Sequence, residues 1–257
     1  MALYIVKIPI FFLVLLKGPM PRKHSRVRSK KSKKTTKKKS TRRSANSKIR
    51  GGGVFSSAVG FLTPKLTDAT IRRAVKDYLG GGARKKLVVV KYGDISHWDV
   101  SNVTDMSSLF QNATSLNQPL NKWNVSNVTY MVCMFQNATS FNQALDKWNV
   151  SNVTNMKWMF LDATSFNQPL NNWNVSNVTN MEWMFSDASC FNQPLNNWNV
   201  SNVTYMESMF AQTNSFNQPL NTWNVSKVTN MEWMFSGATS FNRPLHAPWY
   251  HEESESE

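Results

Sequence analysis

The stretch LNNWNVSNVTNMEWMFSDASCFNQP, residues 170–194, recurs along the chain at a constant length and decides how the chain folds. A unit that recurs at one fixed length is typical of a solenoid, a propeller or another array of repeats. A propeller blade needs about 40 residues, so a 25-residue unit favours a solenoid. Aligned on its first tryptophan, the unit occurs six times, at Trp98, Trp123, Trp148, Trp173, Trp198 and Trp223.

The spacing of apolar residues inside the unit follows the frame of a leucine-rich repeat. Leu170 is followed by Trp173, Val175, Val178 and Met181, at +3, +5, +8 and +11. Trp173 and Val175 alternate with polar residues, which predicts a short strand with one buried face.

The second half of the unit has a different spacing. Met181, Met184 and Phe185 lie at i, i+3 and i+4, which predicts one helical turn. Thr179 and Glu182 match the pattern of a capping box at the start of that turn. We therefore predict an α/β repeat solenoid, leucine-rich-repeat-like, with a short parallel strand and one helical turn per 25-residue repeat.

These residues resemble a known family. The run W-[ND]-V-S-N-V-T-x-M-x-x-M-F followed by F-N-Q-P-L is similar to the BspA-like leucine-rich-repeat surface protein family, over about residues 66–245. The resemblance implies a solenoid and, for some members, adhesion or protein binding. It implies no catalytic residue.

A helical segment is predicted ahead of the repeats. Between residues 67 and 79, five apolar residues fall on one face of a helix: Ile71, Ala74, Val75, Tyr78 and Leu79. The run 87–90 follows as a short β-favouring stretch. We expect this region to cap the solenoid, whose first coil would otherwise expose its core. The full division is 1–20 apolar segment, 21–53 disordered basic arm, 54–94 N-terminal helical cap, 95–245 solenoid and 246–257 C-terminal cap with an acidic tail.

The net charge of +15 belongs to the arm, because residues 21–50 hold 15 Lys and Arg and no acidic residue. Such an arm can bind nucleic acid, act as a nuclear localisation signal, lie on an anionic membrane or serve as a solubilising linker. It has no aromatic residue for stacking on bases, so any nucleic-acid binding would be electrostatic. The candidate electrostatic residues are Arg22, Lys23, Lys30, Lys31, Lys33, Lys34, Lys37, Lys38, Lys39, Arg42 and Arg43.

The apolar run 8–16 leaves two interpretations open. It is either a signal or anchor segment, or a stretch that is not translated because the protein starts at Met20. The first predicts a membrane-associated, surface or secreted protein, and the second a nuclear or virion-associated one.

Two sets of side chains are candidates for binding a protein partner. Trp158, Trp183 and Trp233 share one position in the predicted turn, where they either anchor a partner or pack between neighbouring turns. Lys122 and Lys147 flank the strand tryptophans and are either part of a graded binding surface or simply solvated.

No combination of residues in the sequence indicates an enzyme. The four histidines form no triad with a serine or cysteine, and there is no glycine-rich phosphate loop or metal-ligand cluster. Two cysteines are too few for a disulfide framework or a zinc site. We predict no cofactor, no metal and no small-molecule substrate. The sequence thus indicates a non-enzymatic protein-interaction or surface-structural scaffold, or alternatively a nucleic-acid-associated protein that acts through its basic arm.

Overall fold

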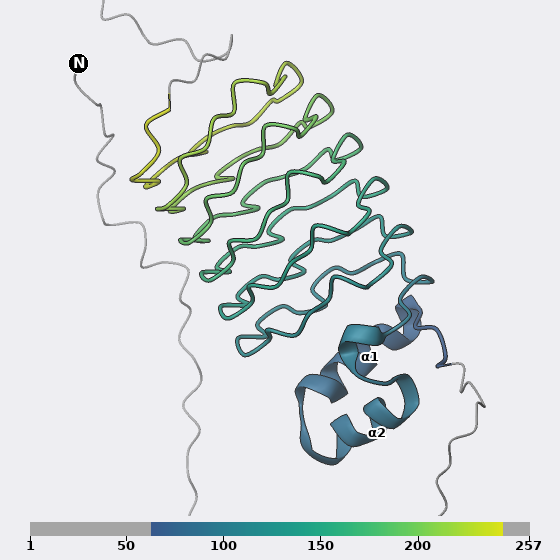
Figure 1. Cartoon of the computed structure of the whole chain (residues 1–257). Helices are drawn as coiled ribbons and strands as arrows, with labels where there is room; N and C mark the ends of the chain where they lie inside the picture. Colours follow the sequence, from purple (N-terminus) through teal and green to yellow (C-terminus); the bar gives the residue numbers. More distant parts are fainter. Residues whose placement is uncertain (1–62, 244–257) are drawn as a thin grey trace, which may run out of the picture. The chain divides into compact units, whose positions relative to one another are not determined.

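The computed structural model describes residues 63–243 (Figure 1). It begins with two helices, α1 (Asp68–Leu79) and α2 (Gly82–Tyr92), and a 3-10 turn, η2 (Ile95–His97). Coils of 25 residues follow up to the end of the described part. The predictions for the apolar segment, the basic arm and the acidic tail concern residues outside this range.

Helix α1 forms where the apolar spacing predicts a helix. Thr67 is its N-cap and forms a capping box with Thr70, so the first free backbone N–H groups are satisfied. Four residues of the predicted face are buried: Ile71, Ala74, Val75 and Tyr78. Leu79, the fifth, is exposed at the end of the helix.

Helix α2 differs from the prediction, because the β-favouring run 87–90 lies inside it. Within this helix only Val88 and Tyr92 are buried, whereas Leu87 and Val90 are 71% and 86% exposed. A run of four residues with no neighbouring strand has no partner for its backbone groups, while a helix satisfies them locally. The run therefore forms a helix despite the β-propensity of its residues, because a helix satisfies its backbone groups.

The core of the coils consists of columns of identical side chains. The indole rings of Trp148 and Trp173 stack at 6.4 Å, and those of Trp173 and Trp198 at 6.5 Å, with planes within 3°. From Trp123 onward, each indole N–H of this column also donates to a carbonyl one coil back, as Trp173 Nε1 does to the carbonyl of Leu145 at 3.0 Å. Phenylalanine columns stack beside them, for example Phe160 on Phe185 at 5.6 Å. One repeated residue type thus supplies both packing and a bond to the preceding coil.

Backbone hydrogen bonds between coils run mainly in one direction. At each of five successive interfaces, four N–H groups of one coil donate to carbonyls of the coil that follows it. We call this set the four-bond ladder. The main bond in the opposite sense is that of the threonine column, in which Thr179 N–H donates to the carbonyl of Thr154 at 2.9 Å. In residues 181–187 the ladder donors are Met181, Trp183, Phe185 and Asp187, and the acceptors are Tyr205, Glu207, Met209 and Ala211, at 2.8–2.9 Å.

The predicted helical turn and capping box take another form. No helix is assigned in the described coils, and residues 181–188 form successive turns in which, for example, Met184 N–H bonds the carbonyl of Met181. A left-handed φ of 56° at Trp183 interrupts any helix there. Thr179 Oγ1 donates to the carbonyl of Thr154 instead of capping a turn. Parallel pairing between coils is limited to single bridges such as Asn155 with Asn180.

Candidate partner-binding surface

The described tryptophans fall into two classes. The six at the start of each repeat are at most 4% exposed and belong to the core. The other three lie within the four-bond ladder: Trp158 and Trp183 are half-buried, and Trp233 is 55% exposed. We call their position the turn column; its members are Ser108, Cys133, Trp158, Trp183, Ser208 and Trp233.

Every member of the turn column has a left-handed backbone, with φ between 51° and 60°. Non-glycine residues seldom adopt this conformation. In five of the six members the backbone N–H donates to the coil that follows, and this bond holds the residue in place. Trp183 N–H, for instance, donates to the carbonyl of Glu207 at 2.8 Å. Nothing in the residue types Ser, Cys and Trp signals a left-handed φ, so the sequence did not reveal this feature.

Trp158 is the centre of a small polar cluster that the sequence analysis missed. The ammonium of Lys157 lies 4.4 Å from the centre of the Trp158 ring and 2.6 Å from Glu182 Oε2. Asn180 Nδ2 donates to the same carboxylate at 3.0 Å. Burial alone would raise the pKa of Glu182, but the hydrogen bonds from Lys157 and Asn180 outweigh it, and the pKa is lowered. The cluster is therefore a charged one, with an ammonium held between an aromatic face and a carboxylate.

The ladder segments carry mostly acidic charge. The segments 105–112, 130–137, 155–162, 180–187, 205–212 and 230–237 contain six acidic residues and one basic residue. Exposed tyrosines accompany them, since Tyr130 is 50% and Tyr205 is 46% exposed. The acidic residues are Asp105, Asp162, Glu182, Asp187, Glu207 and Glu232, and the basic one is Lys157.

Lys122 and Lys147 are exposed but belong to a different part of the coil. Each precedes a core tryptophan of its repeat. Lys122 Nζ lies 3.4 Å from His97 Nε2, and Lys147 N–H donates to Asn121 Oδ1 at 3.1 Å. Their polar contacts within the described residues thus involve neither the turn column nor its carboxylates.

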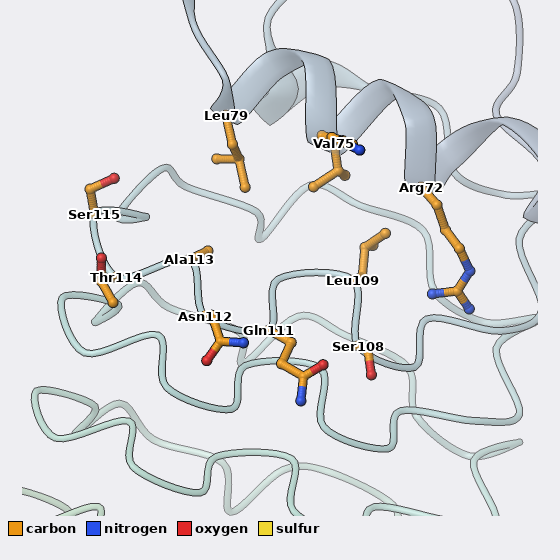
Figure 2. A pocket seen from close by; sticks show the side chains of 11 residues that line it. Arg72, Val75, Leu79, Ser108, Leu109, Gln111, Asn112, Ala113, Thr114 and Ser115 are labelled. Atoms are coloured by element: carbon orange, nitrogen blue, oxygen red, sulfur yellow. The ribbon is translucent and has the colours of Figure 1, made fainter. Parts of the chain in front are cut away.

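A pocket of about 470 Å³ lies between α1 and the first coil (Figure 2). Val75 and Leu79 of α1 face Leu109 and Ala113 of the coil across it. The guanidinium of Arg72 at its edge is already engaged, because it donates to the Ser107 carbonyl and pairs with an aspartate at 2.9 Å. The pocket therefore offers an apolar wall with a mixed polar rim and no paired nucleophile and base.

Within residues 63–243, no three His, Cys, Asp or Glu side chains come together in a way that could hold a metal ion. In the same part of the chain, none of the helices has the length and apolar character needed to cross a membrane. The eleven candidate electrostatic residues of the arm, from Arg22 to Arg43, lie outside the described residues.

The chain matches a known protein family. The model of a family described as "Mycoplasma protein of unknown function, DUF285" matches residues 84–189 and 168–256, so that the two overlapping matches cover more than half of the 257 residues. No curated protein and no solved structure matches the chain.

Proposed function

Because the chain belongs to the DUF285 family of Mycoplasma proteins of unknown function, we propose its role from the geometry: a non-enzymatic repeat scaffold that binds a protein partner through the turn column. The observation that carries this proposal is the contrast between the two tryptophan classes. Core tryptophans are at most 4% exposed, yet Trp233 in the turn column is 55% exposed. Tryptophan is the residue most enriched at the energetic centres of protein interfaces.

The proposal includes the fold class. We place the repeats with the BspA-like leucine-rich repeats, as an α/β solenoid. In support, equivalent residues of successive coils form single parallel bridges, such as Asn155 with Asn180, and the apolar frame from Leu170 to Met181 is buried at every position. In the described coils, successive turns stand where that class has a helical turn.

A second candidate function rests on the arm. Fifteen basic residues between 21 and 50, with no acidic residue among them, suit a protein that binds nucleic acid by neutralising phosphates. In that case binding would fall steeply with salt and would not need the turn column.

The test is capture of partners from an extract of the source cells by the immobilised full chain. We expect the captured protein to be lost when Trp158, Trp183 and Trp233 are changed together to alanine. It should be retained by a chain lacking 21–50, and by a control with the exposed Asn172 and Asn197 changed to alanine. Capture unchanged in the triple variant, with thermal unfolding showing that it is folded, would overturn the proposal. Nuclease-sensitive capture that needs only the arm would favour the second candidate.

A further inference from the structure

We propose that Trp183 and Glu207 form a receptor for a lysine or arginine side chain of a basic partner segment. This inference rests on the proposed function, and it adds the chemistry of the partner. Its basis is a repeated arrangement: one coil earlier, the same arrangement is filled by a lysine of the chain itself.

The filled copy consists of Trp158, Glu182 and Lys157. Trp158 N–H donates to the carbonyl of Glu182 at 2.9 Å, which sets the indole beside the glutamate of the following coil. The ammonium of Lys157 occupies the space that these two residues define, 4.4 Å from the ring centre and 2.6 Å from the carboxylate. A cation that lies on an aromatic face and pairs with a carboxylate is held by two favourable electrostatic contacts.

The second copy has the same backbone. Trp183 N–H donates to the carbonyl of Glu207 at 2.8 Å, and the φ values of the two tryptophans are 60° and 56°. The residue that would supply the cation is different, because Glu182 stands at the position of Lys157. Within the described residues, no ion pair involves Glu207. The second copy thus has the aromatic face and the carboxylate without an ammonium.

Neighbouring residues keep Glu207 in place and add to the surface. Asn230 Nδ2, from the next coil, donates to Glu207 Oε2 at 3.0 Å. Two exposed aromatic side chains, Tyr205 and Trp233, belong to the same and the following coil. The ladder segments carry six acidic residues against one basic residue, so the local charge complements a Lys- or Arg-containing segment. One exposed cation contact improves affinity by only about ten-fold or less, so the ligand is a segment with several cations and not a free ion.

The experiment is a titration of the full chain with a fluorescent peptide of eight lysines, followed by anisotropy. We expect Glu207→Gln and Trp183→Leu each to weaken binding about five-fold. The same peptide with every lysine acetylated should not bind. Lys157→Ala should strengthen binding, because it vacates the first copy.

Glu232→Gln is the matched control. Glu232 occupies the same position in the next coil, and Glu232→Gln removes the same charge. The ladder partner of Glu232, however, is Ser208, which has no aromatic face. Equal weakening by Glu207→Gln and Glu232→Gln would show that only net charge matters, and would overturn the inference. If Glu207→Gln has no effect while partner capture still needs the three tryptophans, the proposed function stands and this inference fails. Glu207→Gln keeps the shape of the side chain and its amide partner, so the test does not depend on Trp183→Leu being folded.

Discussion

Replacing Phe185 with alanine should remove about 4 kcal/mol from the free energy of unfolding. The ring is fully buried, and its centre lies 4.1 Å from that of Phe191, 5.6 Å from that of Phe160 and 5.7 Å from that of Phe210. The change creates a cavity between two coils. Because the four-bond ladder fixes these coils, they cannot move together to fill the cavity. It also removes stacking with a coil on either side, and each aromatic pair contributes about 1 kcal/mol.

Phe235 is the matched control in the last described coil. It stacks on Phe210 at 5.6 Å and on Phe241 at 4.0 Å, and it is only partly buried. Phe235→Ala should therefore cost about 2 kcal/mol, half the central value. Urea unfolding followed by tryptophan fluorescence gives both free energies from midpoint and slope. Equal losses for the two variants, or a loss below about 1 kcal/mol for Phe185→Ala, would refute the view that stability depends on stacking from both sides.

Three further changes test single interactions. Burial and the neighbouring Asp187 raise the pKa of Asp162, so ionisation of this carboxyl opposes folding at neutral pH. Asp162→Asn should therefore raise the melting temperature at pH 7. That gain should vanish as the pH falls below 3.8, the ordinary pKa of the carboxyl group. Burial and the bond to Asp94 raise the pKa of Tyr78 to about 12, so the wild type should lose stability as the pH rises from 10 to 12. Tyr78→Phe should abolish that loss of stability at alkaline pH. It should also lower the free energy of unfolding at pH 7 by about 1–2 kcal/mol. Chemical denaturation at pH 7 and at alkaline pH measures both effects. Trp173→Phe should cost about 2 kcal/mol by urea unfolding, because the indole bond is lost while the accepting carbonyl keeps a backbone partner.

The period of the repeat, the inward apolar set and helix α1 could be read from the sequence. Each depends on the spacing of residues along the chain, which can be read from the sequence without knowing the backbone conformation. The left-handed φ at Trp183 could not be read, because it is imposed by hydrogen bonds to another coil. The run 87–90 favours a strand by residue type, but it lies in α2 because no neighbouring strand is there to pair with it.

For the candidate site, the sequence pointed to the turn column and missed its charged partners. Lys157 and Glu182 are 25 residues apart, so they occupy one position in consecutive coils. Opposite charges at that spacing signal a contact once the register of the coils is known. The spacing of Thr179 and Glu182 also matches a capping box, and this local pattern masks the long-range one.

In the ladder segments, alternate peptide groups point the same way along the stack, with four bonds at each interface against one from the threonine column. Peptide dipoles that point the same way add together, as they do along a helix, and leave partial charge at the two ends. The acceptor end is next to α1, where Arg72 donates to the carbonyl of Ser107 and so places a cation at the negative pole. The last described coil is the positive pole, because the ladder donates toward it at every interface. Gain or loss of a whole repeat would change the length of this dipole and leave both poles as they are.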